Sequence, residues 1–268
     1  MEKNLKVIEH SKGDFYFLYL RKLSEEGTTD HRWHEHTFYE IMYFSEGESE
    51  FVIENRRYKV KGGDVLLIKP GNHHFQRTMY ERENALYCIG FYPDAIESKA
   101  LAEELFERGH HFSVGEDSPL SRLLKVASDK LDQSKLNAKV FVKAVCEAAI
   151  SILYDTDMKR ERSLHIKNDN VDKVISFINS NLLSIRTTED ITGALFFSES
   201  YLRAIFKREM GIGVMEYVRN KKLLFADRKI RDGKKPTEVY SECGFLNYPS
   251  FYRAYTAYFG CSPKSRKP

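Results

Sequence analysis

Residues 187–211 read TTEDITGALFFSESYLRAIFKREMG, and residues 236–263 read PTEVYSECGFLNYPSFYRAYTAYFGCSP. Each stretch contains a short helical pattern, a turn and a second, capped helix, which is the order of a helix-turn-helix unit. Residues 214–231 form one long helical pattern between them. At 1.5 Å per residue this connector would be about 27 Å long, close to one turn of DNA at ~34 Å. The spacing therefore predicts two recognition helices that can enter successive major grooves.

In the first unit, Ser198 is expected to cap a recognition helix over residues 199–210. Helical spacing turns Leu202, Ile205 and Phe206 inward and leaves the opposite side exposed. An Arg side chain can donate two hydrogen bonds to a guanine edge, a Ser hydroxyl suits several bases, and a Lys suits a phosphate. We therefore predict DNA contacts from four residues of this helix: Ser200, Arg203, Ala204 and Lys207.

The second unit is expected to start at Pro236, to turn at Gly244 and to begin its recognition helix after the cap Asn247. Pro249 fits the first turn of that helix, where its missing N–H costs little. The residues expected to face inward are Phe251, Ala254, Tyr255 and Phe259. The residues left to face DNA are Tyr248, Tyr252, Arg253 and Thr256. We interpret Arg253 as a phosphate contact.

The charge distribution agrees with a nucleic-acid partner for the C-terminal half. Lys and Arg minus Asp and Glu give about −5 for residues 1–155 and +8 for residues 156–268, which sum to the net charge of +3. A basic half is the electrostatic footprint of a phosphate-binding surface. The alternative is a chance asymmetry of a solvated surface.

Composition describes a globular protein of two domains. The chain has 268 residues, 42% hydrophobic and 30% charged, so each half can bury its own core. No apolar run approaches the ~18 residues of a membrane span, and the first residues lack a secretory signal. We expect a cytoplasmic protein without membrane partners. The four cysteines are widely spaced and form no CxxC pair, which predicts reduced, mostly buried thiols.

Short β-rich runs separated by turn residues extend from Asp14 to about Pro93 and predict a small barrel. A hairpin is expected from Phe51 to Val60, with its turn at residues 54–57. Four residues of this region form a histidine and carboxylate constellation: His34, His36, Glu40 and His74. If residues 34–40 are one strand, the first three of these share a face, because side chains alternate along a strand.

Helical spacing then takes over in three segments, residues 96–108, 119–131 and 137–154. The third carries a broad apolar stripe that suits either packing on the barrel or pairing with a second copy, and we favour the second slightly. The expected organisation is a barrel over residues 1–95, a helical segment over 96–156, a linker over 157–168 and the DNA-binding domain over 169–268.

Two family resemblances follow from these motifs. His34, His36, Glu40 and Gly47 match the first motif of the cupin superfamily, G-x5-H-x-H-x3,4-E-x6-G, apart from its leading Gly. The C-terminal hundred residues resemble the AraC/XylS family of bacterial transcription regulators. The matches in the first unit are Ser198, Tyr201, Leu202, Phe206, Lys207 and Gly211. Those in the second are Gly244, Phe245, Phe251, Arg253, Gly260, Ser262 and Pro263. The family's second pattern has a small Ala, a Phe and a basic residue where this chain has Tyr240, Tyr255 and Thr256.

The resemblance implies an α+β protein: a cupin-like sensor barrel with a helical segment, then an all-α domain of two helix-turn-helix units joined by a long helix. It implies a transcription regulator, an activator by our expectation, that binds double-stranded DNA and the transcription machinery as a homodimer. A small-molecule effector would enter the barrel near His34, His36, Glu40 and His74. No cofactor is required, but in metal-binding cupins the equivalents of these residues hold a divalent transition metal.

Two alternatives stay open at this level. A metal-dependent cupin enzyme with an accessory helical domain would use the same histidines and carboxylate, whereas we expect no enzymatic activity. A DNA-binding protein whose barrel serves only dimerisation would use them to pin the fold.

Overall fold

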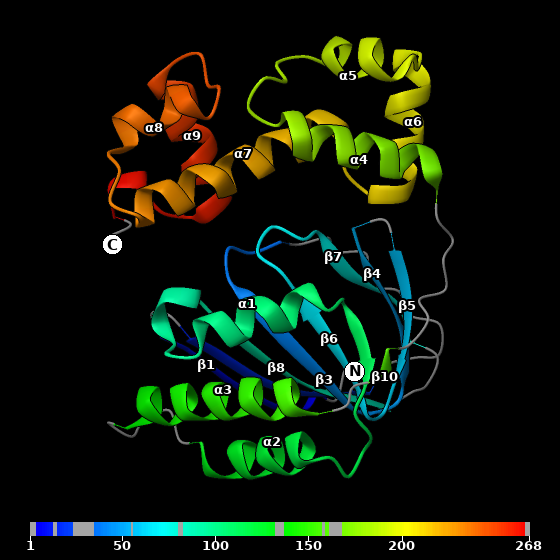
Figure 1. Cartoon of the computed structure of the whole chain (residues 1–268), viewed down its shortest axis with the longest axis vertical. Coiled ribbons are helices and arrows are strands. Elements are labelled where there is room, and N and C mark those ends of the chain that lie inside the picture. The colour runs from blue at the N-terminus through cyan, green and yellow to red at the C-terminus, as the bar shows by residue number, and fades with distance from the viewer. Residues whose placement is uncertain are drawn as a thin grey trace. The chain divides into compact units, whose positions relative to one another are not determined.

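The computed structural model of the chain describes residues 4–12, 15–23, 35–54, 56–79, 83–131, 137–156, 159–160 and 168–265. The chain divides into two compact units, Met1–Ile166 and Lys167–Pro268 (Figure 1). The expected linker over residues 157–168 lies almost entirely outside the described residues, so its boundaries stay a prediction.

The N-terminal unit is built on two antiparallel sheets. The larger sheet has the strand order β1-β2-β8-β3-β6-β9-β10, and the smaller has the order β5-β4-β7. The strands are β1 (Asn4–Lys12), β2 (Phe15–Leu23), β3 (Tyr39–Glu46), β4 (Glu48–Ile53), β5 (Arg56–Lys61), β6 (Asp64–Ile68), β7 (His74–Met79), β8 (Glu83–Phe91), β9 (His111–Ser113) and β10 (Lys159–Arg160). The predicted β-rich N-terminal domain is confirmed.

Side-chain alternation gives the larger sheet two apolar faces. On β3, Met42 and Phe44 point between the sheets, while Ile41 and Tyr43 point to the other side. The interior between the sheets is filled by Met42, Phe44, Phe51, Ile53, Tyr58, Val60, Leu66, Ile68, Leu86 and Cys88. Because strands of both sheets contribute to it, this cluster closes the barrel.

Three helices cover the other face of the larger sheet (Figure 1). They are α1 (Lys99–Glu107), α2 (Pro119–Lys130) and α3 (Ala138–Asp155), and the 3-10 turn η1 (Pro93–Ala95) precedes them. Most of the α3 stripe packs into this core, including Val145 and Leu153. Val140 remains exposed. The apolar stripe is therefore mainly a packing surface, because the sheet needs cover on this side.

Two local expectations for this unit need correction. The hairpin is present, and Glu54 at its turn has the left-handed φ of 52° that tight hairpins favour, but Arg56 and Arg57 belong to β5 rather than to the turn. The predicted helical segment also contains a strand, β9, which pairs with β6 through Phe112 and Val65. A three-residue strand between helices is too short to show a periodicity.

The C-terminal unit contains only helices among its described residues. They are α4 (Asp169–Asn181), α5 (Thr188–Leu195), α6 (Glu199–Met210), α7 (Val214–Arg231), α8 (Pro236–Glu242), α9 (Tyr248–Phe259) and the 3-10 turn η2 (Pro263–Ser265). The pairs α5–α6 and α8–α9 are the two predicted units, and α7 is the predicted connector. No helix of the described part is long and apolar enough to cross a membrane.

Capping side chains start the helices where the sequence predicts. Ser198 accepts a hydrogen bond from the Tyr201 N–H at 3.2 Å, and Asn247 accepts one from the Ser250 N–H at 2.9 Å. Thr187 and Asp190 form a capping box at α5. Each cap satisfies an N–H that the helix itself cannot pair, so α5, α6 and α9 have fixed starting points.

Two cationic side chains connect the first helix-turn-helix unit to α7 and to the second helix-turn-helix unit. Arg186, in the loop before α5, donates to the carbonyl oxygen of Gly244 in the second turn at 2.8 Å. The buried Lys222 of α7 donates to the carbonyl oxygen of Ile185. The loop of the first unit is therefore joined both to the connector and to the turn of the second.

Candidate DNA-binding and effector sites

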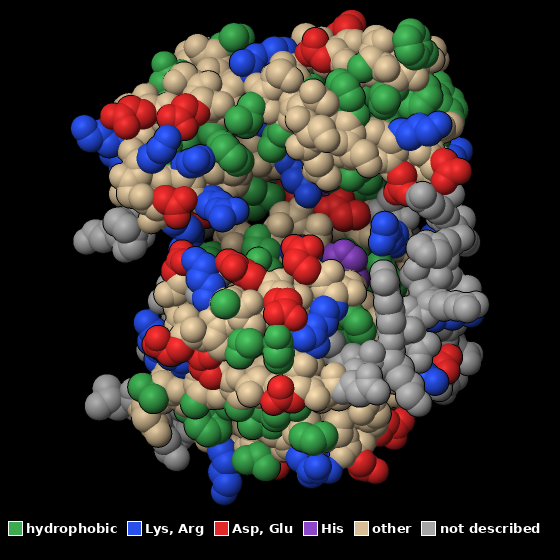
Figure 2. Space-filling view, in the orientation of Figure 1, with side chains coloured by type: hydrophobic (Ala, Val, Ile, Leu, Met, Phe, Trp, Pro, Cys, Tyr) green, Lys and Arg blue, Asp and Glu red, His purple; other side chains and the backbone are tan. Residues whose placement is uncertain are grey.

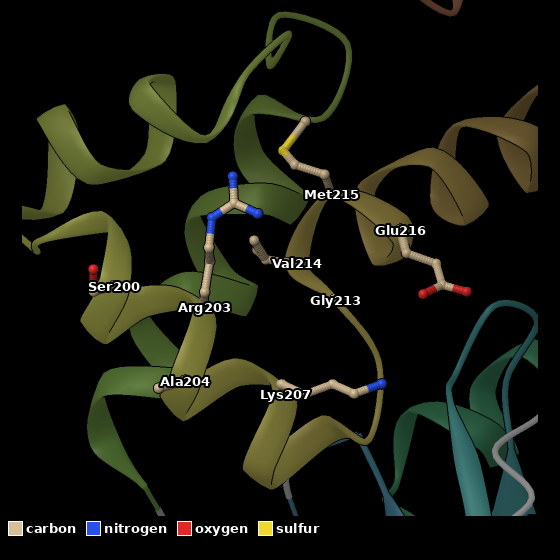
Figure 3. Close-up of a pocket in the computed structure, with 8 residues that line it drawn as sticks. All are labelled: Ser200, Arg203, Ala204, Lys207, Gly213, Val214, Met215 and Glu216. Carbon is tan, nitrogen blue, oxygen red and sulfur yellow. The ribbon is translucent and has the colours of Figure 1, made fainter.

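The exposed side of α6 forms one wall of a groove of about 620 Å³. All four residues predicted to contact DNA from this helix line it, and the start of α7 forms the other wall (Figure 3). The α7 residues that line it are Gly213, Val214, Met215 and Glu216, counting the N-cap Gly213. The inward residues of α6, including Leu202 and Phe206, are fully buried as predicted.

Arg203 projects from α6 into this groove and is held by its neighbours (Figure 3). Its Nε donates to Glu199 Oε1 at 2.9 Å, and its Nη2 contacts the same oxygen and lies 3.5 Å from Thr188 Oγ1. An exposed ion pair of this kind is worth only about 0–1 kcal/mol, so the guanidinium can exchange it for a ligand. Sequence reasoning missed Glu199 as a partner, although its i,i+4 spacing to Arg203 is the signal for such a pair.

Lys207 extends from α6 toward the turn before α7 (Figure 3). Its Nζ donates to the carbonyl oxygen of Gly211 at 2.6 Å, which caps the end of the helix. A cation at this end also complements the helix dipole. Lys207 therefore has a structural role besides the phosphate contact that the sequence predicts.

The second reading helix, α9, presents a different surface. Tyr252 and Arg253 are exposed, as predicted. Tyr248 and Thr256 are only half-exposed, and their hydroxyl oxygens are buried with no hydrogen-bond partner among the described residues. Their predicted outward orientation is therefore wrong for the atoms that would bond to a base. The ring of Tyr248 packs edge-on against Tyr240 at 5.8 Å, which keeps it in this position.

In the barrel, the strand that was expected to carry the first histidines begins too late to do so. β3 starts at Tyr39, so among the expected ligands the alternation argument applies to Glu40 only. His34 lies outside the described residues. His36 precedes the strand and reaches Glu40 across a bend, with 3.2 Å between its Nε2 and Glu40 Oε2.

His36, Glu40 and His74 nevertheless come together at one end of the barrel. Their ligand atoms all lie within 4.8 Å of one another, and His74 Nε2 is 3.5 Å from Glu40 Oε2. The Nδ1 of His36 lies 2.8 Å from the Phe38 carbonyl oxygen, and that of His74 lies 2.9 Å from the Asn72 carbonyl oxygen. Because a carbonyl oxygen only accepts, both Nδ1 atoms carry the proton and both Nε2 atoms face the carboxylate.

Positive charge between His36, Glu40 and His74 would stabilise this arrangement. Burial alone would raise the pKa of Glu40, but hydrogen bonds from His36 and His74 outweigh it and hold the pKa well below its ordinary value. If both imidazoles were neutral, their Nε2 lone pairs would face a carboxylate oxygen. Protons on Nε2 or a bound cation remove that repulsion.

The three groups also fit a divalent transition metal. Two imidazole nitrogens and one carboxylate oxygen are ligands that such metals take. Metal-bound histidines commonly donate their other ring N–H to a backbone carbonyl, as His36 and His74 do. The donor set is thus suitable for a metal ion or for a ligand rich in hydrogen-bond donors.

Further buried groups are adjacent to this triad, His73 and Glu35 in the sequence and Cys88 in space. His73 Nδ1 lies 2.6 Å from Glu35 Oε2, and both side chains are almost fully buried. Burial and the neighbouring Glu40 carboxylate raise the pKa of the Cys88 thiol well above its ordinary value, so this cysteine stays protonated. All four cysteines are free, and three of them are buried, as predicted.

The surface shows no large single-sign patch on the face drawn in Figure 2. Lys and Arg side chains are interspersed there with Asp and Glu on both units.

Known protein families match both units. The profile described as "AraC-like ligand binding domain" matches residues 21–145, and the profile described as "Helix-turn-helix domain" matches residues 191–266. The probable transcriptional regulator LumQ of Photobacterium leiognathi is 24% identical over 233 residues, which cover 86% of this chain and 90% of LumQ. The transcriptional activator RhaR of Yersinia pestis (bv. Antiqua, strain Angola) is 21% identical over 247 residues, covering 86% and 82% of the two chains.

Among solved structures, ToxT from Vibrio cholerae O395 is similar over 94% of this chain and 96% of its own, with 13% identity and a TM-score of 0.40. A score this low carries no weight by itself, whereas the two profiles each match the expected half of the chain. The chain belongs to the AraC family of transcriptional regulators, with an N-terminal ligand-binding domain and a C-terminal helix-turn-helix DNA-binding domain.

Proposed function

We propose that this regulator reads DNA with α6 and α9 and that Arg203 recognises a guanine. The observation that carries the proposal is the position of Arg203. It stands on the exposed side of a capped helix, faces a groove and is oriented by Glu199. Bidentate donation from Arg to the guanine O6 and N7 is the commonest specific contact in the major groove.

Ser200 and Ala204 share this side of α6 and would lie next to the same base pairs. Lys207 and Arg253 are exposed cations, and we assign both to phosphate contacts. Tyr248 and Thr256 would contribute shape rather than hydrogen bonds, because their hydroxyl oxygens are buried.

The test of DNA reading starts with the full-length protein and a duplex selected by it from a random library. Arg203→Ala should lose about 1–3 kcal/mol of specific binding and relax the preference at one guanine. Arg208→Ala is the matched control, because Arg208 is an exposed arginine of the same helix that pairs with Glu209 and does not line the groove. Equal losses in the two variants, or an unchanged base preference in Arg203→Ala, would remove Arg203 from the reading role.

The effector would bind at the end of the barrel that holds His36, Glu40 and His74. These residues are polar groups next to an apolar interior, and they offer acceptors that a cation or a donor-rich molecule satisfies. If the ligand is a metal ion, these three side chains would hold it, and the ion would supply the positive charge between them.

Metal content and thermal shifts test the barrel site. Protein purified without chelators should carry a divalent metal, or should be stabilised by one of Mn²⁺, Fe²⁺, Ni²⁺ or Zn²⁺ or by a small molecule, and Glu40→Gln should remove the effect. Glu46→Gln is the control, since Glu46 is an exposed residue of the same strand. Stabilisation that survives in Glu40→Gln would place the effector elsewhere.

We also propose a cytoplasmic homodimer that acts on the transcription machinery by binding rather than by catalysis. The relatives are transcription regulators. Two exposed valines, Val126 of α2 and Val140 of α3, support pairing with a second copy through these helices. Two copies would bind two sites on one DNA and gain affinity from the linkage. Sedimentation of the Val140→Glu variant tests the pairing, and an unchanged dimer would exclude this surface.

A further inference from the structure

The two reading helices can be compared position by position, because they are capped in the same way. Each has 12 residues, starts after a side-chain cap and ends at a left-handed glycine, Gly211 or Gly260. Counting from the caps Ser198 and Asn247, the fourth residue is buried in both helices, and so is the eighth. The outward faces must then correspond as well.

This count places chemically different residues at the same positions. Arg203 and Tyr252 are both fifth after the cap, and Ser200 and Pro249 are both second. A proline has no N–H and no polar side chain, and a tyrosine cannot donate the paired hydrogen bonds that an arginine gives to guanine. At these two positions the second helix therefore lacks the donors with which the first can read base edges.

Apart from Arg253, the exposed residues at the start and on the outer side of α9 are mainly apolar. Leu246, one residue before the cap, is 91% exposed, and Tyr252 is 38% exposed. The ring centroids of Tyr252 and Tyr248 lie 6.2 Å apart at a tilt of 49°, so Tyr252 is supported by a second aromatic ring while part of it stays exposed. The hydroxyl oxygens of Tyr248 and Thr256 are buried.

The apolar group that a major groove offers is the C5 methyl of thymine. We infer that the second unit recognises thymine methyl groups by packing them against Pro249 and Tyr252, whereas the first unit reads a guanine edge with Arg203. Arg253 takes the position of Ala204 and adds a phosphate contact. The inference rests on the proposed entry of α6 and α9 into the major groove.

The experiment uses the full-length protein and the duplex that it selects from a random library. Guanines of this duplex are first replaced one at a time by 7-deazaguanine. The part bound by α6 is the part where this replacement weakens binding of the wild type but not of Arg203→Ala. In the other part, each thymine is replaced by deoxyuridine, which removes only the methyl group. Loss of one contacted methyl should weaken binding about fourfold.

Two variants of Tyr252 test whether α9 causes the sensitivity of binding to deoxyuridine. Tyr252→Phe keeps the ring and should stay sensitive to deoxyuridine, whereas Tyr252→Ala should bind thymine and deoxyuridine duplexes equally. Insensitivity of the wild type to deoxyuridine throughout the second part would overturn the inference, as would sensitivity retained in Tyr252→Ala. Failure to select any duplex would instead refute the proposed function. A Tyr252→Ala defect confined to transcription, with DNA binding unchanged, would assign this face to a protein partner and also overturn the inference.

Discussion

Replacing Tyr255 with Phe removes a single hydroxyl from the centre of the second helix-turn-helix unit. Tyr255 is fully buried on α9, and its hydroxyl donates to the carboxylate of Asp227, which is fully buried on α7. The second oxygen of Asp227 accepts from Arg231 Nε at 3.0 Å. The ring keeps its packing in the variant, so the expected loss comes from the hydrogen bond.

A hydrogen bond to a charged group contributes about 1.5–3 kcal/mol. We take about 2 kcal/mol for Tyr255→Phe, because the acceptor stays charged and buried while its donor is lost. For a domain of about 100 residues, that loss lowers the melting temperature by about 8–16 °C. It should be confined to the C-terminal unit, which contains both partners.

Hydrogen exchange of the full-length chain, followed by mass spectrometry, measures this loss locally. Amides of α7 and α9 should exchange faster in Tyr255→Phe, while those of the barrel should not change. Tyr252→Phe is the control, since it removes a hydroxyl from the exposed side of the same helix. Combining Tyr255→Phe with Asp227→Asn gives a double-mutant cycle. A loss below about 0.5 kcal/mol, or full additivity of the two changes, would refute the pairing as the origin of the stability.

Three further changes have defined outcomes. Gly244→Ala should destabilise the fold by more than Gly233→Ala in urea unfolding, because both glycines have positive φ but only at Gly244 would the new Cβ meet a side chain, that of Arg186. Phe196→Gly should stabilise by about 1 kcal/mol in the same assay, since Phe196 is 94% exposed and holds a left-handed φ of 56°, and an unchanged midpoint would show that no strain is stored there. The pKa of Glu40 is lowered in the folded protein, so its interactions stabilise the fold above its ordinary pKa of about 4.3 and are lost as the pH falls through the lowered value. Glu40→Gln should therefore flatten the acid side of a plot of melting temperature against pH, and an unchanged slope would contradict this.

The helices of the DNA-binding domain could be predicted from local signals. α6 and α7 have the predicted bounds, because Ser198 starts the first, Gly211 ends it and Gly213 precedes the second. Caps and glycines act within a few residues, so a sequence shows them directly. The fold class of the barrel was also predictable, from its repeated short strands and turns.

The order of strands and the shape of the barrel site were not predictable from the same signals. β9 has three residues and no periodicity of its own, and its pairing with β6 and β10 makes it a strand. His36 reaches Glu40 across a bend rather than along a strand. Such contacts depend on tertiary structure, which no local spacing encodes.

The second recognition helix shows how tertiary context changes a surface prediction. Helical spacing alone places Tyr248 and Thr256 on the outer side of α9, but Tyr240 fills the space beside Tyr248 and the hydroxyl oxygens of both predicted readers are buried. In the family that the sequence resembles, a small residue is usual at the position of Tyr240. The large ring of Tyr240 and the changed outer surface of α9 beside it are therefore parts of one set of substitutions.

The residues at which the second helix-turn-helix unit departs from the family pattern are physically coupled. Tyr255 is larger by one hydroxyl than the usual Phe, and Asp227 on α7 receives that hydroxyl in the core. Together with the Tyr240 and Tyr248 pair, this contact fixes α9 from the inside. On its outside, Pro249 and Tyr252 occupy the positions at which α6 carries the donors Ser200 and Arg203. Because Arg186 also joins the turn before α9 to the first unit, a guanine contact made by α6 would place α9 at a set position on the DNA. Base selection by hydrogen bonding is then concentrated in α6, and α9 would add register and apolar contact.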